Sequence, residues 1–396
     1  MMIPRELSQE LKRAAGEWPV VTLTGPRQSG KTTLVRSVFP DMHYVSLEDI
    51  EARRFAREDP TRFLDTYGEG VILDEVQHVP ELLSAVQTHV DLDGRRGRFI
   101  LTGSSNLLLL RSVQQSLAGR SAILRLYPFS EDELANYGTP SASLDAALVT
   151  GFYPPIHDRK LEPRRWYAQY VATYLERDVR NLLDVTSLDR FGVFLRMCAA
   201  RTGQLVNLSS LGSDCGITHS TVRAWLSVLQ ATYVVHLLTP HHANLNKRLI
   251  KTPKLYFVDP GLAAYLLEID QPRGLTTHAM RGALFETWVV SEILKTYANA
   301  GLDPRIDFFR DQAGHEIDLI VREGDVPVPV EIKSGATIAS DFFRGLGYWS
   351  RLTNADPAQG WLVYGGEADQ QRSKGRVLGW RSLRILKQHI LDLARM

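Results

Sequence analysis

The chain of 396 residues is organised around one stretch near its start, Gly25-Pro26-Arg27-Gln28-Ser29-Gly30-Lys31-Thr32-Thr33. Its pattern, G-x-x-x-x-G-K-[ST], is that of a loop that binds nucleotide phosphates. Apolar and β-branched residues precede it from Val20 to Thr24, which predicts a short buried strand. Lys31 to Val38 contains neither Gly nor Pro and predicts a helix. We therefore expect the loop between a strand and a helix, the context that the motif requires.

The residue types in this loop suit phosphate binding. Glycines let the backbone fold tightly, so that its N–H groups point at phosphate oxygens. The N-terminus of the following helix adds a positive partial charge. We expect Lys31 to reach the β- and γ-phosphates of ATP and Thr32 to ligate Mg²⁺. The alternative is a glycine-rich turn of no function, which a second motif argues against.

This second motif is an apolar run, Val71-Ile72-Leu73, that ends in Asp74 and Glu75. The run predicts a buried strand whose acids emerge beside the phosphate loop. Asp74 is expected to hold Mg²⁺, directly or through water, and Glu75 to orient and polarise the attacking water. A strand end that meets solvent can carry two acids by chance. Its position about 45 residues after the loop favours the catalytic interpretation.

Two further elements could complete a nucleotide site. Residues 98–106 predict a strand that ends in small polar residues, among which Thr102, Ser104 and Asn106 are candidate sensors of the γ-phosphate. A plain strand-to-turn junction explains each of them equally well. Arg120 could act as an arginine finger on the nucleotide of a neighbouring subunit. A solvated surface arginine is the alternative.

Together these motifs resemble the AAA+-like P-loop ATPases of archaea and bacteria. The residues that carry the resemblance are Gly25–Thr33, Val71–Gln77, Leu101–Ser104 and Ala118–Arg120. The subfamily that the chain resembles also has a C-terminal domain called DUF4143, and this likeness extends over nearly the whole sequence. The resemblance implies an α/β fold with a parallel P-loop sheet, ATP and Mg²⁺ as cofactors, and assembly into a homo-oligomer.

The later sequence predicts three more parts after an ATPase core at residues 1–126. They are a helical lid or connector (127–185), a winged helix (186–274) and an α/β domain (275–396). In the winged helix, Thr218 is expected to cap a helix. Basic residues between or on the two wing strands could contact nucleic-acid phosphates, namely Lys247, Arg248, Lys251 and Lys254. Alternatively, this part only packs against the ATPase core or a neighbour.

A second chemical site is predicted in the last part. On the helix expected from Met280 to Asn299, a step of 100° per residue puts Glu286 in the middle of an apolar face. An unpaired charge there is costly, so Glu286 needs a partner, and a metal is one option. Strands are expected at 305–309, 315–321 and 328–333. Glu331 and Lys333 lie two apart and share a face, which Asp318 on the adjacent strand can join.

This pattern resembles the PD-(D/E)xK nucleases over about residues 275–370. The resemblance implies that Glu286, Asp318 and Glu331 bind Mg²⁺, with the Ile332 carbonyl as a further ligand, and that Lys333 stabilises developing negative charge. The alternative is a nuclease-like fold with ordinary salt bridges. Pro327 and Pro329 predict that their strand lies at an edge or starts late. A helix is expected over 340–350 and a last strand over 359–364.

Bulk properties are those of an ordinary globular protein, with 44% hydrophobic and 23% charged residues. The net charge of +1 gives no overall sign of a nucleic-acid partner, although a local basic patch stays compatible with it. No signal peptide or membrane span is expected, and two cysteines without metal-ligand spacing favour a reducing, cytoplasmic location. We expect an ATP-regulated, metal-dependent nuclease that acts on nucleic acid, preferentially DNA. Two rivals are a nucleotide-switched DNA-binding or interaction protein with an inactive nuclease-like domain, and an ATPase that serves protein assembly.

Overall fold

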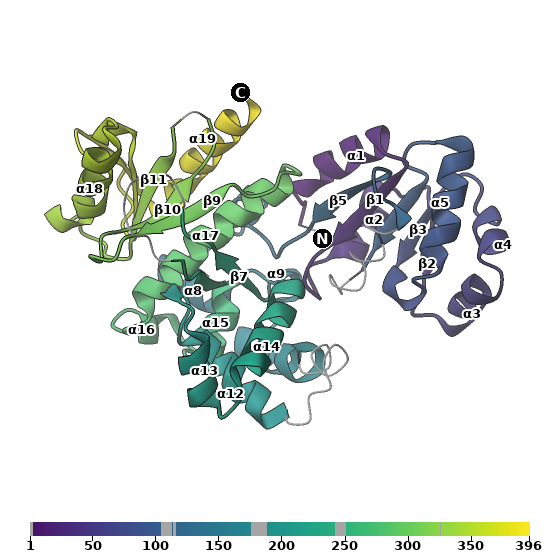
Figure 1. Cartoon of the computed structure of the whole chain (residues 1–396), viewed down its shortest axis with the longest axis horizontal. Coiled ribbons are helices and arrows are strands. Elements are labelled where there is room, and N and C mark those ends of the chain that lie inside the picture. Colours follow the sequence, from purple (N-terminus) through teal and green to yellow (C-terminus); the bar gives the residue numbers. More distant parts are fainter. Residues whose placement is uncertain (1–2, 104–112, 114–115, 176–187, 242–250, 325) are drawn as a thin grey trace.

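Figure 1 shows three parts of the chain arranged around one long helix, α17 (Arg281–Asn299). We name them the N-terminal domain (3–126), the middle segment (127–279) and the C-terminal domain (280–396). The computed structural model describes residues 3–103, 113, 116–175, 188–241, 251–324 and 326–396. Across these residues, no helix combines the length and apolar character needed to cross a membrane.

The N-terminal domain is a parallel sheet covered by helices on both faces. Its strands are β1 (Val20–Thr24), β2 (His43–Ser46), β3 (Val71–Asp74), β4 (Phe99–Thr102) and β5 (Ser121–Arg125). They lie in the order β2-β3-β4-β1-β5, and every neighbouring pair is parallel. Strands β1, β3 and β4 are buried at every residue, as expected for strands covered on both sides. Because parallel strands end at one edge, the segments after β1 and β3 emerge together.

Alternate strand residues pack against two groups of helices. On one face, α1 (Leu7–Glu17) and α2 (Lys31–Val38) cover Val21 and Leu23. On the other, α5 (Leu82–Asp93) covers Val20 and Leu73. The described residues of the domain also form α3 (Ile50–Glu58), α4 (Pro60–Asp65) and the short η1 (Val76–His78).

The middle segment is mostly helical and contains one small antiparallel sheet. Its strands β6 (Gln204–Leu205), β7 (Val235–Leu238) and β8 (Lys254–Phe257) lie in the order β6-β8-β7. Its helices are α7 (Glu131–Asn136), α8 (Leu144–Thr150), α9 (Pro154–Asp158), α10 (Pro163–Tyr170), the π-helical η2 (Val171–Leu175), α12 (Leu188–Ala199), α13 (Leu208–Cys215), α14 (His219–Ala231), α15 (Pro260–Leu266) and α16 (Pro272–Leu275).

Of the features predicted for a winged helix in this segment, one is confirmed and one is wrong. The Thr218 hydroxyl caps α14 by accepting a hydrogen bond from the Thr221 N–H at 3.2 Å, as predicted. Of the four expected wing cations, Lys251 is exposed, whereas Lys247 and Arg248 lie outside the described residues. Lys254 was predicted wrongly: it is buried against carboxylates and is not available to a nucleic-acid phosphate. The winged-helix assignment itself stays a prediction.

The C-terminal domain is built on a six-stranded mixed sheet in the order β13-β14-β12-β11-β10-β9. Its strands are β9 (Ile306–Arg310), β10 (Glu316–Val321), β11 (Val328–Lys333), β12 (Trp361–Tyr364), β13 (Gln370–Arg372) and β14 (Gly375–Gly379). Helix α18 (Arg344–Thr353) packs on one face, and α17 and α19 (Leu383–Arg395) pack on the other. Short helices η3 (Ser340–Phe343), η4 (Pro357–Gln359) and η5 (Trp380–Ser382) complete the domain. The α/β fold predicted from the sequence is confirmed.

Two details of this sheet differ from the prediction. Strand β11 is internal, between β10 and β12, so the edge placement was wrong; its pairing with β12 does start late, at Val330, after Pro329. Strand β12 is not the last, because β13 and β14 follow it. Strand β13 is short, polar and exposed, so it lacks the apolar alternation by which a strand is recognised.

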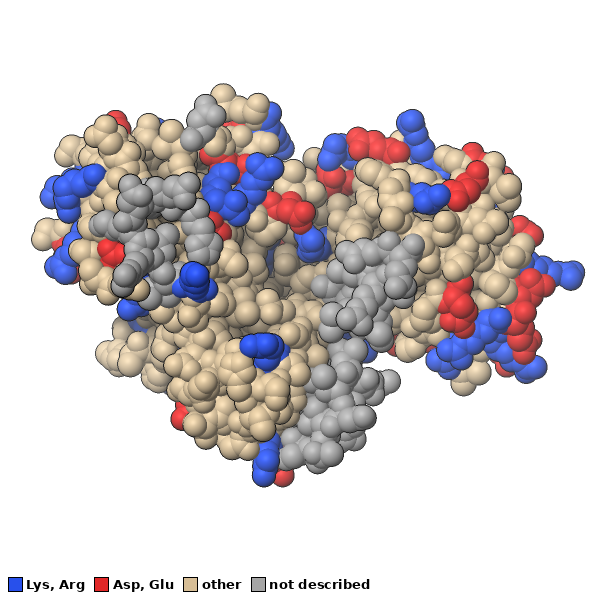
Figure 2. Space-filling view, in the orientation of Figure 1, with Lys and Arg blue, Asp and Glu red and all other residues tan. Residues whose placement is uncertain are grey.

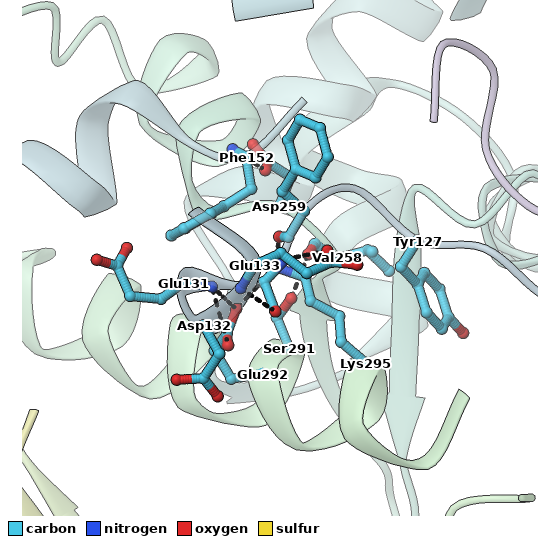
Figure 3. Close-up of polar contacts among 12 residues, drawn as sticks. Tyr127, Glu131, Asp132, Glu133, Phe152, Val258, Asp259, Ser291, Glu292 and Lys295 are labelled. Carbon is cyan, nitrogen blue, oxygen red and sulfur yellow. Dashed lines mark hydrogen bonds and ion pairs between the residues drawn. The ribbon is translucent and has the colours of Figure 1, made fainter. Parts of the chain in front are cut away.

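Helix α17 is buried on nearly all sides, not on one face. Residues of the middle segment and the C-terminal domain meet around it in one continuous hydrophobic core. About 120° around the helix from Glu286, at 100° per residue, it carries Glu292, whose carboxylate lies 3.0 Å from Lys295 Nζ and 3.0 Å from Lys387 Nζ of α19. Figure 3 shows Glu292 and Lys295 next to the backbone of Glu131, at the start of the middle segment. This buried ion cluster joins α17 to both of its neighbours.

We predict that Glu292→Gln lowers the free energy of unfolding by about 3 kcal/mol, since removing one member of a buried ion pair leaves charge uncompensated. Lys387 keeps Asp132 as a partner at 2.6 Å, which limits the loss. Urea unfolding followed by the fluorescence of Trp288, which is buried on the same helix, measures the effect. Arg54→Ala, which breaks an exposed pair with Glu58, is the control and should leave the midpoint nearly unchanged.

The destabilisation caused by Glu292→Gln should depend on pH. Burial raises the pKa of Glu292, but attraction to Lys295 and Lys387 outweighs it, so the pKa lies below its ordinary value. The stabilisation is then present above the ordinary glutamate pKa of about 4.3 and is lost as the pH falls through the lower value in the folded state. The difference in the free energy of unfolding between wild type and Glu292→Gln should become smaller below that pH. A constant difference would contradict the ionic origin of the effect.

Candidate functional site

A cavity of about 340 Å³ lies at the edge of the N-terminal sheet where β1 and β3 end. The phosphate loop forms one wall, with Lys31 and Thr32, and Glu75 lies on the wall formed after β3. The middle segment supplies the opposite wall from Phe129 and from α9, with Pro154, Pro155 and Asp158. The volume is in the range of small-molecule sites, so the two parts together enclose the candidate nucleotide site.

The backbone of the loop has the tight curve that the motif predicts. Gly25 has φ +147°, and a Cβ there would lie 2.1 Å from the Leu126 carbonyl oxygen, so only glycine fits. Lys31 Nζ donates to the carbonyl oxygens of Gly25 at 3.0 Å and Pro26 at 2.9 Å. These contacts place the ammonium group inside the curve of the loop. Arg27, Gln28 and Thr33 line the cavity beside it, whereas Ser29 is buried behind the loop.

The two residues expected to hold Mg²⁺ are in contact. Thr32 Oγ1 donates to Asp74 Oδ2 at 2.9 Å, although the two residues are 42 positions apart in the sequence. Tyr44 donates to the same oxygen at 2.7 Å, and Thr102 donates to Asp74 Oδ1. A hydroxyl and a carboxylate that converge in this way are oxygen ligands of the kind Mg²⁺ prefers, so the residues present fit the ion.

The contact of Thr102 differs from the one expected of a γ-phosphate sensor. Its hydroxyl is directed at Asp74, which makes it a positioning residue for that carboxylate and not a sensor of the γ-phosphate. Ser104 and Asn106, the other two candidates, lie outside the described residues. No γ-phosphate sensor is thus identified on the described part of β4.

Glu75 has a backbone conformation that is uncommon for a residue with a side chain. Its φ is +55°, in the left-handed region, immediately after the buried strand β3. The Gln77 amide donates to its carboxylate, which fixes the side chain at the cavity wall. Such backbone strain persists only where the surroundings enforce it, and it is concentrated at functional sites. Glu75 is therefore held where a catalytic base would stand.

Arg5 is a component of this site that sequence reasoning missed. It is buried, and its guanidinium donates to the Ser29 carbonyl of the loop at 2.8 Å and to the Tyr127 carbonyl at 2.6 Å. It also pairs with Glu133 of α7 at 3.0 Å. Arg5 thus ties the phosphate loop to the middle segment. No local pattern marks it, because its partners lie up to 128 residues away.

Arg120 lies at the opposite edge of the sheet from its own nucleotide cavity. It comes directly before β5, next to the start of β1, whereas the phosphate loop follows the end of β1. Its guanidinium forms two hydrogen bonds with Asp91, at 2.5 and 3.0 Å. Five strand residues span about 16 Å, so Arg120 cannot reach the phosphates bound by its own chain. Any role in catalysis must be on another subunit.

In the C-terminal domain, three of the four predicted site residues come together. Lys333 Nζ lies 3.0 Å from Asp318 Oδ2 and 2.6 Å from Glu331 Oε2. The Ile332 N–H also donates to Asp318, at 2.8 Å. Glu331 packs against α18 at Gly345, where a Cβ would lie 1.6 Å from its Oε1 and 2.7 Å from the Glu316 carbonyl oxygen, so the backbone contact leaves room only for glycine. Asp318, Glu331 and Lys333 therefore form a compact cluster in which both carboxylates are buried and Lys333 is partly exposed.

Glu286 has different partners. It accepts hydrogen bonds from Lys254 Nζ, at 2.9 Å, and from the Tyr256 hydroxyl, both on β8 of the middle segment. Lys254 also lies 2.5 Å from Glu316 Oε1. Among the described residues, no three His, Cys, Asp or Glu side chains are arranged to hold a metal ion. The expected three-carboxylate metal site is thus not assembled: Lys254 pairs with Glu286, whereas Lys333 pairs with Asp318 and Glu331.

Electrostatics in this cluster follow from burial and charge crowding. Burial and the neighbouring Asp318 raise the pKa of Glu331 to about 8. Burial alone would raise the pKa of Asp318, but Lys333 and Lys254 outweigh it and lower that pKa. Burial also raises the pKa of Glu286, which Lys254 offsets only in part. The carboxylates depend on nearby cations to remain charged, and in this structure the cations are lysines.

Fold and site together define an ATPase with a phosphate-binding loop. Known sequence families match three stretches of the chain: "AAA domain" over residues 17–135, "Domain of unknown function (DUF8612)" over 141–273 and "Domain of unknown function (DUF4143)" over 281–383. Uncharacterized protein Rv2008c of Mycobacterium tuberculosis and Uncharacterized protein Mb2031c of Mycobacterium bovis are each 31% identical over 341 residues, 84% of this chain and 74% of the relative. The chain belongs to the family of AAA-like ATPases that carry a C-terminal DUF4143 domain.

Solved structures with a similar arrangement include the Walker-type ATPase PABY2304 of Pyrococcus abyssi, with a TM-score of 0.47 and 15% identity. The likeness covers 67% of this chain and 96% of that one. AMPPCP-bound DnaA from Aquifex aeolicus has a TM-score of 0.28 and 12% identity, with 57% and 85% of the two chains covered.

We predict that Arg120 is needed in trans. Arg120→Ala and Lys31→Ala should each lose ATP hydrolysis, and mixing the two variants should restore part of it. Mixed oligomers would contain sites in which an intact loop faces an intact arginine. Steady-state phosphate release measures the rescue, and exchange of labelled subunits shows that mixing took place. Arg95→Ala, an exposed arginine of the same domain, is the control. Complete exchange without rescue would contradict the role in trans.

Proposed function

We propose that the chain is a Mg²⁺-dependent ATPase that works as a homo-oligomer and acts on nucleic acid. The observation that carries the ATPase part is the contact of Thr32 with Asp74 in the cavity that also contains Lys31 and Glu75. In this proposal Lys31 turns from the loop carbonyls to the β- and γ-phosphates of ATP. Thr32 and Asp74 would hold Mg²⁺, which would supply positive charge beside those phosphates. Glu75 accepts a proton from the water that attacks the γ-phosphate.

Variants of two residues separate binding from hydrolysis. Lys31→Ala should abolish ATP binding, because the loop loses its positive charge. Glu75→Gln should bind ATP and hydrolyse it at least ~100-fold more slowly, which is the contribution expected of a general base. Fluorescent-nucleotide binding and phosphate release measure the two steps. Glu58→Gln, an exposed carboxylate of the same domain, is the control. Hydrolysis by Glu75→Gln at the wild-type rate would show that another group activates the water.

The nucleic-acid part of the proposal is supported by the cluster of Asp318, Glu331 and Lys333. A lysine held between two carboxylates on adjacent strands provides three of the four residues that the nuclease resemblance implies, without Glu286. We propose DNA as the substrate and ATP as the regulator of cleavage. The alternative is a nucleotide-switched DNA-binding protein whose nuclease-like domain is inactive. One observation favours this alternative, namely that Lys254 takes the Glu286 carboxylate that a metal would need.

Charge on the face shown in Figure 2 does not favour either possibility. On the face shown in Figure 2, basic and acidic side chains are interspersed over the N-terminal domain, and much of the middle segment has few charges. A continuous basic stripe is not visible on that face among the described residues. DNA contact therefore has to be tested by its dependence on salt, because each phosphate contact adds to the salt sensitivity of binding.

A cleavage assay on varied DNA and RNA distinguishes an ATP-regulated nuclease from a DNA-binding protein with an inactive nuclease-like domain. With ATP and Mg²⁺, the wild type should cleave, and Asp318→Ala and Lys333→Ala should not. ATP hydrolysis should stay within about twofold of wild type in both variants, because the P-loop site lies in another domain. Asp356→Ala, at an exposed turn of the same domain, is the control for cleavage. Salt-sensitive DNA binding without cleavage under all conditions would establish the alternative.

A further inference from the structure

Lys254 is a buried cation contributed to the C-terminal carboxylates by a different part of the chain. It is the first residue of β8, the central strand of the small sheet in the middle segment. Only 2% of its surface is exposed, and its ammonium lies over the ring of Phe308 at 5.5 Å from the centroid. A lysine is rarely buried to this degree unless it is paired. Its partners therefore determine its role.

These partners are one carboxylate of the predicted metal site and one carboxylate that was not predicted. Lys254 Nζ lies 2.9 Å from Glu286 Oε1 on α17 and 2.5 Å from Glu316 Oε1 on β10. Arg310 approaches the other oxygen of Glu316 at 3.0 Å. An ammonium group that contacts two carboxylates at such distances stands where a divalent cation bridging them would stand, since Mg²⁺ and Mn²⁺ also bind carboxylate oxygens. The two cations cannot share the position.

The backbone around Lys254 is fixed to the C-terminal sheet. The Phe308 N–H of β9 donates to the Thr239 carbonyl at 3.1 Å, and the His241 N–H donates to the Phe308 carbonyl at 2.7 Å. The segment after β7 thereby extends the edge of that sheet, and β7 pairs with β8 so that Leu238 lies opposite Lys254. Lys254 is therefore delivered by a strand pair that is itself docked on β9. Withdrawing the lysine requires β8 to move relative to β9 and α17.

We propose that Lys254 is a tethered cation that closes the C-terminal carboxylate site, and that a divalent cation binds there only when the lysine is withdrawn. The inference rests on the proposed nuclease function for its biological meaning, but its geometry does not depend on cleavage. It also assigns Glu316 to the site. The closed state is an autoinhibitory contact between two parts of one chain, and apparent metal affinity falls in proportion to the fraction of open sites.

Replacing the lysine tests the competition directly. Full-length Lys254→Met keeps the length of the side chain and removes its charge. Without nucleotide, titration calorimetry should show Mn²⁺ binding at least ~10-fold tighter than wild type, as expected if most wild-type sites are closed. Mn²⁺ should also raise the melting temperature of the variant more than that of the wild type. Lys251→Met, an exposed lysine three residues away, is the matched control and should behave as wild type.

A second substitution locates the new site. Lys254→Met/Glu286→Gln should lose the gained Mn²⁺ binding, because one of the two carboxylates freed by the first change has been removed. If Lys254→Met does not fold, Lys254→Gln takes its place, since its amide still donates hydrogen bonds to the carboxylates without bringing a charge. Wild-type binding as tight as that of the variant, or no gain in a folded variant, would overturn the inference.

These experiments distinguish failure of the closed-site inference from failure of the proposed nuclease function. ATP hydrolysis measured on the same preparations reports on the phosphate-loop site alone. A gain of Mn²⁺ binding without cleavage of any nucleic acid supports the closed-site inference and contradicts only the nuclease proposal. Cleavage by wild type that needs no ATP, with Mn²⁺ binding unchanged in Lys254→Met, contradicts the inference and leaves the nuclease proposal intact.

Discussion

The carboxylate of Glu292, enclosed by Lys295 and Lys387, is the constraint on which the arrangement of the three parts depends. A charge buried this deeply requires its partners in place, so α17 cannot shift alone. Lys295 also donates to the Phe129 carbonyl, near the start of the middle segment, and Ser291 donates to the Val258 carbonyl, directly after β8 (Figure 3). The middle segment is thereby held where it can close the nucleotide cavity on one side and the carboxylate cluster on the other.

The middle segment contacts both candidate sites through neighbouring residues. The Tyr233 hydroxyl lies 2.8 Å from Thr24 Oγ1, immediately before the phosphate loop. Strand β7 begins two residues later and pairs with β8, on which Lys254 reaches Glu286. A physical connection thus runs from the loop to the C-terminal cluster through one short strand pair. Coupling between the sites would require this pair to have two stable positions, which contiguity alone does not provide.

The sequence predicted those structural features that depend on residues close together in the chain. The phosphate loop, its strand and its helix follow from turn chemistry and periodicity, and Asp318, Glu331 and Lys333 follow from the alternation of adjacent strands. Contacts between distant segments could not be predicted this way. Arg5 and Lys254 carry no local signal. The periodicity of α17 predicted one apolar face around Glu286, whereas the helix is buried on nearly all sides, so it gave no reason to expect Glu292 to be buried as well. Lys254 was predicted to be exposed because no local pattern connects it with the carboxylates of the C-terminal domain.

The distance in sequence between Glu292 and Lys387 has a consequence for synthesis on the ribosome. The two residues are 95 positions apart, and Lys387 lies in the last helix of the chain. Domains generally fold from the N-terminus as the chain emerges, so α17 is synthesised well before one of its two lysine partners exists. We expect the nascent chain to complete the N-terminal sheet early and to hold α17 in a loosely packed state. The shared core can then close only after α19 has been synthesised, so a chain interrupted within that helix would carry a folded N-terminal sheet and an incompletely packed remainder.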